Sequence, residues 1–482
     1  MRKQIGLFLM IFFLCADASQ AQNFITKWRF TAATTQIDFL AGTAGVVNYT
    51  WAHGASSGSG SFNTGAFGAV TITGINLPAN TELTLQIEPA NFRRFFIRNN
   101  ANSRDGLRDI SQWGTVPWST MQAAFAGAPN LNISATDVPD LTNVTNMAEM
   151  FSASSSVNGP ANIGSWNTAN VTNMSFMFSG ATAFNQPLNN WNVSNVMNMQ
   201  NMFYVAASFN QPLNNWSVSN VTNMQNMFYG ASSFNQPLNN WNTGNVTDMS
   251  YMFHQAFAFN QPIGNWDVRK VTTFSNMLVN AIAFNQNLGN WRLNPNSTGL
   301  SFLTTAVDCQ NYSLTLKGWA ENNPTVTNRT IGGDGRTYGP AAVAYRNQLI
   351  SQGWTILNDT YNASCAVVLP VVLGDITAVS KNKRLLVSWT TFSETNNDHF
   401  EIEASVDGEN FTRIGRVSSK ATNGNSEQSL IYQLEISASE SNSLLLSLGV
   451  LALGAIGLGA TRKFRSLFGL LLLLGFLLYG EL

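Results

Sequence analysis

Tryptophan recurs at a 25-residue step along the centre of the chain, and the other apolar positions keep the same step. The series runs Trp166, Trp191, Trp216, Trp241, Trp266 and Trp291. Met-Phe pairs at 177–178, 202–203, 227–228 and 252–253 and Phe-Asn-Gln triplets from Phe184, Phe209, Phe234, Phe259 and Phe284 share that step. A fixed period of this length is typical of stacked repeats, each burying its apolar face on the next. We therefore predict about eight coils between Trp118 and roughly Ala306.

The spacing inside one repeat predicts a strand, then a helix or helical turn, and then a loop. Leu188, Trp191 and Val193 follow the cadence of a short strand, in which side chains alternate between core and solvent. The next apolar positions follow helical spacing: Val196, Met199, Met202, Phe203 and Ala206. The segment Phe209–Leu213 contains Pro212 and ends the helix. Each coil is thus predicted to be of mixed α/β class.

Asparagine fills the polar positions of the repeat. Between Asn167 and Asn265 the only Asp, Glu, Lys or Arg is Asp248. Two Asn columns share the repeat step, Asn185, Asn210, Asn235 and Asn260, and Asn170, Asn195, Asn220 and Asn245. Amides stacked in register can hydrogen-bond along a column and satisfy backbone groups at the coil corners. We predict this structural role in preference to a ligand surface.

The repeats resemble the BspA-like leucine-rich-repeat surface proteins of bacteria, on the motif WNVSNVTNM…MF..A.SFNQPLNN. The resemblance implies a leucine-rich-repeat-like solenoid over 105–308, a β-sandwich-like domain over 22–104 and a C-terminal cap over 309–368. Alternation in Val70-Thr-Ile72-Thr and in Leu83-Thr-Leu85-Gln-Ile87 supports strands in the first of these flanks. In the cap that the resemblance implies, we expect a disulfide between Cys309 and Cys365.

Residues 369–440 resemble part of a fibronectin type III module, and 443–482 form an apolar tail. Ser443–Ala460 is 18 residues without a charge, about 27 Å as a helix, which predicts a transmembrane helix. Arg462, Lys463 and Arg465 follow and place that side in the cytoplasm. The 13-residue run Leu467–Tyr479 is a second arm of a hairpin or an interfacial segment.

Residues 1–21 predict a signal peptide. Arg2 and Lys3 precede an apolar run and a small-residue site ending at Ala21. A lipoprotein attached through Cys15 is the alternative, but Leu14 stands where a small residue is needed. We expect an exported protein on the cell surface, anchored in the membrane by its C-terminal segment.

The composition offers little chemistry. Without its two ends the chain carries a net charge near −4 over about 420 residues, so no nucleic-acid partner is expected. His53, His254 and His399 lie in different regions without metal-site neighbours, and Gly332–Gly335 is interpreted as a turn. We predict no enzyme, no catalytic or metal-binding residue and no cofactor.

The leading hypothesis is recognition or adhesion, with an extracellular protein or glycan as partner. A structural spacer or surface-layer component without a specific ligand is the alternative, and an enzyme with the repeats as an appendage is a third hypothesis. Solvent-facing positions beside each Trp are uniform and uncharged until the last coils, where charges enter. The ligand-contact candidates are Asp267, Arg269, Arg292, Asn240, Asn242 and Asn265. The alternative explanation of the same change involves no ligand: coils beside a cap are generally less regular.

Overall fold

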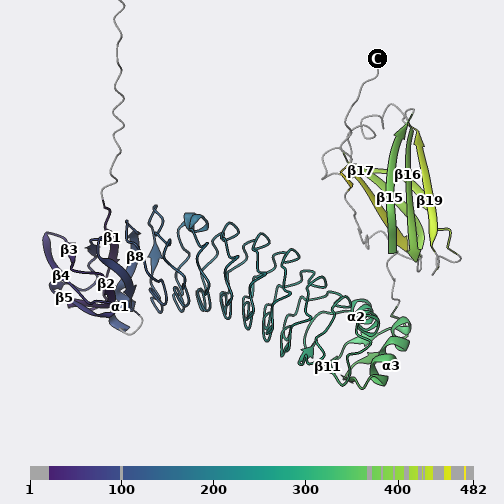
Figure 1. The fold of residues 1–482 in the computed structure, drawn as a ribbon, viewed down its shortest axis with the longest axis horizontal. Coiled ribbons are helices and arrows are strands. Elements are labelled where there is room, and N and C mark those ends of the chain that lie inside the picture. The colour runs from purple at the N-terminus through teal and green to yellow at the C-terminus, as the bar shows by residue number, and fades with distance from the viewer. Residues whose placement is uncertain are drawn as a thin grey trace, which may run out of the picture. The chain divides into compact units, whose positions relative to one another are not determined.

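A computed structural model describes residues 21–97, 101–365, 372–381, 384–393, 397–405, 412–421, 426, 429–437, 450–457 and 472–473. The chain forms two compact units, Met1–Asn362 and Ala363–Leu482 (Figure 1). The predicted signal peptide lies outside the described residues except for Ala21. Most of Leu467–Tyr479 also lies outside them.

The first unit begins with two packed sheets. One has the strand order β4-β3-β6-β1-β8-β9 and the other β5-β2-β7. The strands are β1 (Phe24–Trp28), β2 (Thr34–Thr43), β3 (Val47–His53), β4 (Ser56–Phe62), β5 (Gly68–Leu77), β6 (Leu83–Ile87), β7 (Phe92–Phe96), β8 (Leu107–Gln112) and β9 (Asn132–Ile133), with a short helix α1 (Ala101–Gly106) before β8. Aromatic rings fill the space between the sheets, among them Phe24, Phe39 and Phe95. The two strands predicted from alternation are confirmed as β5 and β6.

The central repeats form a stack of coils that contains almost no regular structure (Figure 1). Each coil, taken here as the segment from one Trp of the series to the residue before the next, is a series of tight turns. One isolated parallel bridge joins each coil to the next, as in Asn198↔Asn223 and Asn223↔Asp248. The 3-10 helix η1 (Ala161–Ser165) precedes the Trp166 coil. The predicted strand that begins at Leu188 is wrong, and Val196–Ala206 forms consecutive turns in place of the predicted helix.

Backbone hydrogen bonding explains the missing helix. The N–H groups of Met199, Asn201, Phe203 and Val205 donate to carbonyls of the next coil. The alternate N–H groups of Met202, Tyr204 and Ala206 donate three residues back, within their own coil. Asn201 and Val205 have φ of 56° and 54°, a left-handed conformation that a right-handed helix excludes. Consecutive turns therefore bury the same positions that helical spacing would bury.

The predicted fold class is consequently wrong. The first unit and the second build their regular structure mainly from strands in several small sheets, and the coils have no α/β leucine-rich-repeat geometry. A mixed α/β leucine-rich-repeat-like solenoid followed by a transmembrane helix does not describe the chain. The sequence period was correct, but the elements assigned to it were not.

Side chains in register hold the coils together. The Trp residues from Trp166 to Trp291 are at most 3 % exposed. Each of them from Trp191 onward donates its indole N–H to a carbonyl just before the preceding Trp, as Trp216 does to Leu188 at 2.9 Å. In the first Asn column, Asn210 Oδ1 accepts the backbone N–H of Asn235 at 3.0 Å. In the second, Asn220 Nδ2 donates to the Ser194 carbonyl at 2.7 Å. The predicted structural role of the Asn columns is confirmed.

Residues 300–362 cover the end of the stack. Two helices, α2 (Cys309–Asn322) and α3 (Val343–Ser351), accompany the short strands β10 (Leu300–Ser301), β11 (Thr330–Gly332), β12 (Thr337–Tyr338), β13 (Thr355–Leu357) and β14 (Thr360–Tyr361) and the 3-10 helix η2 (Pro340–Ala342). On α2, Thr315 and Trp319 bond the backbone of Leu288 in the preceding coil. Cys309 and Cys365 are both disulfide-bonded.

The second unit contains two further sheets, ordered β15-β16-β19 and β18-β17-β20-β21. Their strands are β15 (Val372–Lys381), β16 (Arg384–Ser393), β17 (Asn397–Ser405), β18 (Thr412–Ser418), β19 (Leu430–Ser437), β20 (Val450–Gly457) and β21 (Leu472–Leu473). Trp389, Phe400 and Tyr432 form the centre of the core.

The predicted transmembrane helix at Ser443–Ala460 is wrong. Val450–Gly457 within it is strand β20 and pairs antiparallel with β17. The 8 residues of β20 are apolar, and an apolar run of that length fits a strand as well as a helix. Across the described parts of the chain, the structure contains no helix with the length and apolarity to cross a membrane.

Candidate binding surface

The corner of each coil that carries the Trp presents its flanking polar residues to solvent. Asn240, Asn242 and Asn265 are exposed or half-exposed, while Trp241 and Trp266 beside them are buried. The predicted direction of these side chains is therefore confirmed even though no strand forms. Whether a ligand contacts them stays a prediction.

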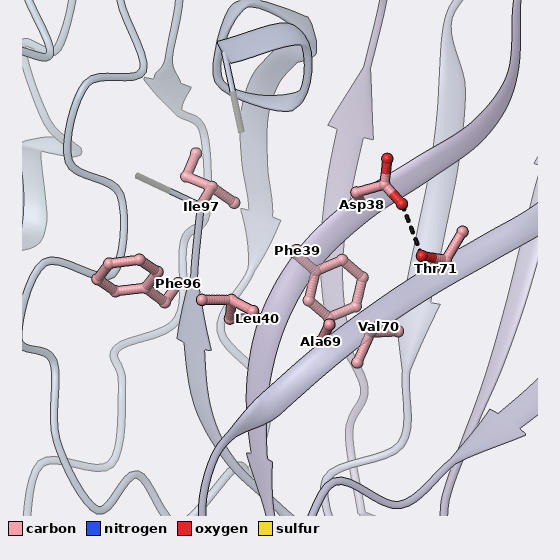
Figure 2. Close-up of a pocket in the computed structure, with 8 residues that line it drawn as sticks. All are labelled: Asp38, Phe39, Leu40, Ala69, Val70, Thr71, Phe96 and Ile97. Carbon is pink, nitrogen blue, oxygen red and sulfur yellow. Dashed lines mark hydrogen bonds between the residues drawn. The ribbon is translucent and has the colours of Figure 1, made fainter. Parts of the chain in front are cut away.

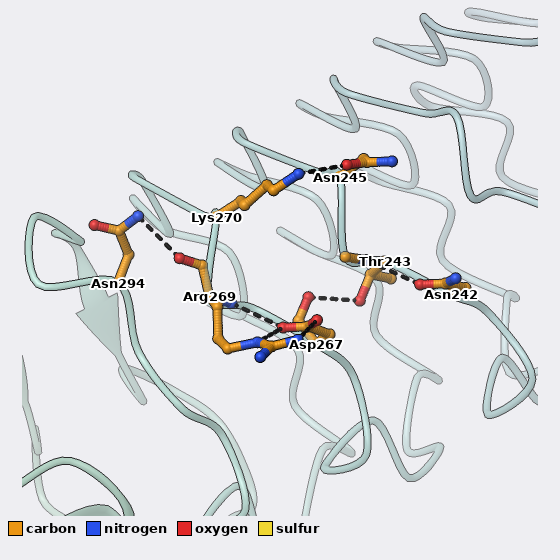
Figure 3. Close-up of polar contacts among 8 residues, drawn as sticks. Asn242, Thr243, Asn245, Asp267, Arg269, Lys270 and Asn294 are labelled. Carbon is orange, nitrogen blue, oxygen red and sulfur yellow. Dashed lines mark hydrogen bonds and ion pairs between the residues drawn. The ribbon is translucent and has the colours of Figure 1, made fainter.

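Asp267 and Arg269 bind each other (Figure 3). Arg269 donates from Nε to Asp267 Oδ1 at 2.9 Å and from Nη2 to Oδ2 at 2.6 Å. These hydrogen bonds lower the pKa of Asp267 below, and raise that of Arg269 above, its ordinary value. The side chains are 32 % and 66 % exposed, so the pair faces water and contributes little to folding. The two charges therefore form an ion pair with each other in the absence of a ligand.

Neighbouring coils are tied to this pair by backbone contacts. Thr243 donates to the Asp267 carbonyl at 2.9 Å, and Asn294 donates to the Arg269 carbonyl at 3.0 Å. Lys270 donates to Asn245 Oδ1 at 2.6 Å across the next corner (Figure 3). These contacts continue the bonding of the Asn columns.

Among the remaining predicted residues, the three asparagines are hydrogen-bonded within the stack, whereas Arg292 is not hydrogen-bonded to any described residue. Asn265 donates from Nδ2 to the Asn239 carbonyl at 2.7 Å, and Asn242 Oδ1 accepts the backbone N–H of Gly244. Asn240 accepts at Oδ1 from Asn239 Nδ2 and donates its backbone N–H to Asn214 Oδ1. Arg292 is exposed and has no hydrogen bond or ion pair to any residue that the structure describes. Arg292 is thus the predicted charge most available to a partner.

A second surface, on another corner of the coils, was not predicted as a site. Tyr204, Tyr229 and His254 stack with ring centroids 4.7 Å apart at each step. Tyr251 lies beside this column, 5.6 Å from His254 between centroids. Burial lowers the pKa of His254, an effect opposed in part by a hydrogen bond with the Asn276 backbone. His254 occupies the repeat position that Tyr204 and Tyr229 hold in the two preceding coils, and it continues their column.

Large apolar side chains are exposed near this aromatic column in the sequence. Phe257 is 44 % and Ile282 is 58 % exposed. Both occupy one position of the repeat, at which the three preceding coils have Thr182, Ala207 and Ser232. A position-by-position alignment of the repeats reveals this change to large apolar residues, just as it reveals the charged residues at the Trp corner.

One protein family matches part of the chain. The family described as "Mycoplasma protein of unknown function, DUF285" matches residues 119–231 and 206–315, two overlapping stretches of the coils. The similarity covers the repeats and the first residues of α2. No curated protein and no solved structure matches the chain.

Proposed function

We propose that the protein is an exported recognition protein whose coils bind an extracellular protein or glycan. The N-terminal pattern of residues 1–21 and the disulfide-bonded Cys309 and Cys365 support export, because disulfides persist in oxidising compartments. The resemblance to bacterial surface proteins supports recognition. The proposal includes no catalytic step.

The observation that carries the proposal is the pair of exposed apolar residues, Phe257 and Ile282. The repeats are their own control, since Ala207 and Ser232 occupy the same position in coils with the same buried columns. The Ala258 N–H donates to the Ser232 carbonyl, as the Ser233 N–H does to Ala207, so the backbone is in register there. Folding therefore does not require a large apolar side chain at this position, whereas contact with a partner uses one.

A structural spacer is the second candidate, and a specific observation favours it. The charges that break the uniform Trp corner, Asp267 and Arg269, pair with each other. That corner accordingly offers little beyond a uniform polar surface. A recognition protein should bind its partner through the corner that carries Phe257 and Ile282, whereas a spacer should bind no specific partner at either corner.

The test compares the two surfaces in the full-length exported protein. One variant combines Phe257→Ser and Ile282→Ser, and a second combines Asp267→Ser, Arg269→Ser and Arg292→Ser. Wild type is first screened on glycan arrays and extracellular matrix proteins. We expect the first variant to weaken attachment at least about tenfold, equal to about 1.4 kcal/mol, with unchanged thermal stability.

Ala207→Ser, at the same position of another coil, is the matched control and should leave attachment unchanged. Attachment that survives the first variant and falls with the second would place the binding surface on the Trp corner. Absence of saturable attachment by wild type to every array and matrix protein would favour the spacer.

A further inference from the structure

The sheet β5-β2-β7 has a hollow on its outer face (Figure 2). Alternate residues of β2 point into the core, and Ile37, Phe39 and Ala41 are buried there. The residues between them point outward. The hollow measures about 280 Å³ and is lined by Asp38, Phe39, Leu40, Ala69, Val70, Thr71, Phe96 and Ile97.

A cation lies at one side of this hollow. Arg94 pairs with Gly42 in the register of β7 on β2, as Phe96 pairs with Leu40. The Arg94 guanidinium carbon is 4.1 Å from the ring centroid of Phe67 and 5.8 Å from that of Phe96. Two phenyl rings therefore hold the guanidinium, and one of them lines the hollow.

Gly42 permits this arrangement. A Cβ atom at Gly42 would lie 2.6 Å from the Ala66 carbonyl oxygen and 3.1 Å from Arg94 Cβ. Only a residue without a side chain allows the turn before β5 to approach so closely. That approach brings Phe67 onto Arg94.

The charge of Arg94 has no counter-ion in the part of the chain that the structure describes. Its Nε is buried without a hydrogen-bond partner, and burial lowers its pKa with no compensating carboxylate. Arg346 of the same unit, by contrast, is forked onto the carboxylate of Asp359. A half-buried cation is unfavourable without an anion, so the site is suited to receive one.

The far side of the hollow is polar. Thr71 donates its hydroxyl to Asp38 Oδ1 at 2.7 Å (Figure 2). Positions 38 and 42 of β2 are separated by about 13 Å at the rise of a strand. Leu40, Ala69 and Phe96 lie between these ends. The surface therefore presents a cation, an apolar floor and the polar side chains of Thr71 and Asp38 in that order, and the two oxygens of Asp38 already accept from Thr71 and Gln36.

We propose that this hollow binds an acidic sugar residue. Its carboxylate pairs with Arg94, its C–H face lies on Phe96 and Leu40, and its hydroxyls face Thr71 and Asp38. A peptide carboxylate fits less well, because the hollow lies on the sheet face across three strands and offers no row of free backbone groups. The inference does not depend on what the coils bind.

The experiment uses the full-length protein with methyl glucuronide as probe and methyl glucoside, which lacks the carboxylate, as its neutral counterpart. We expect saturable binding of the glucuronide by titration calorimetry or ligand-observed NMR. Arg94→Met should weaken it at least about tenfold and should not lower the unfolding temperature, because it removes an unpaired half-buried charge. Arg29→Met, at an exposed position, makes the same change of net charge and should leave binding unaltered.

Three results would overturn the proposal. One is an absence of saturable glucuronide binding to wild type at millimolar concentrations. A second is equal binding by wild type and Arg94→Met. A third is equal binding of N-acetylglutamate methylamide, which would show that Arg94 accepts any carboxylate and that no sugar is recognised.

Discussion

The indole ring of Trp216 lies parallel to that of Trp241 in the next coil, with centroids 6.4 Å apart and planes 2° from parallel. Trp216 is 2 % exposed and its Nε1 donates to the Leu188 carbonyl. Trp216→Ala therefore removes a buried ring and leaves a carbonyl without its donor. We expect a loss of about 3–5 kcal/mol in the free energy of unfolding, measured by urea titration. Asn215→Ala, at the neighbouring position, is the control, and a loss below about 1 kcal/mol at Trp216 would contradict the buried column.

The Asn columns are predicted to matter one amide at a time. Asn210 Oδ1 accepts from the backbone N–H of Asn235 and from Nε2 of Gln236, each at 3.0 Å. Asn210→Ala leaves both donors without this acceptor and should cost about 1–3 kcal/mol. Asn190→Ala, at an exposed position, should change stability by about 0.5 kcal/mol or less. Equal losses for the two variants would mean that the column adds no stability of its own.

The stability of the first unit should depend on pH through His254. Burial lowers the pKa of His254, so the unfolded chain binds a proton at a pH where the folded chain does not. Its contribution to stability is therefore present above the ordinary histidine pKa, about 6.5, and is lost as pH falls through the lower folded value. His254→Tyr restores the residue of the preceding coils and should remove this component of the pH profile.

The measurement is the urea midpoint of wild type and His254→Tyr between about pH 7.5 and 4.5, a range that spans the histidine titration. His254→Phe is the control, because it also removes the titrating group and should follow the His254→Tyr profile. Parallel pH profiles for wild type and both variants would show that His254 does not contribute.

A buried ion pair should stabilise the region after the coils. Arg346 donates from Nε and Nη2 to the two oxygens of Asp359, whose side chain is fully buried. Arg346→Met leaves this carboxylate unpaired and should cost about 3–5 kcal/mol. Lys27→Met removes an exposed pair with Glu82 in the same unit and should cost at most about 1 kcal/mol. Similar losses in both variants by urea titration would contradict the difference in burial.

The sequence predicted the repeat and its buried columns but not the backbone that carries them. The burial pattern at Val196, Met199, Met202 and Phe203 fits a helix and a series of tight turns equally well. What separates them is where the N–H groups bond, and here alternate groups bond the next coil. Left-handed φ at Val205, a β-branched residue, has no sequence signal.

The candidate surface was also predicted only in part: exposure of its residues was predicted, but their contacts were not. Exposure of Asn242 and Arg269 follows from their positions near a buried Trp, and both are exposed. The mutual pairing of Asp267 and Arg269, which forms where a turn replaces the predicted strand, depends on side-chain geometry that their exposed positions alone do not indicate. The hollow beside Arg94 joins three strands that are distant in sequence, and no local pattern indicates it.

The coils between Trp191 and Asn265 meet their neighbours through the same Trp and Asn columns, so this part of the stack can change its length by whole coils without disturbing its interior. Recombination between two near-identical stretches gains or loses one coil, and each column then meets the same neighbours as before. Coils of slightly different length also keep the columns in register, since Phe125, Phe151 and Phe178 stack although they are separated by more than the usual step. The length of the stack can therefore increase or decrease in steps of one coil, about 5 Å each.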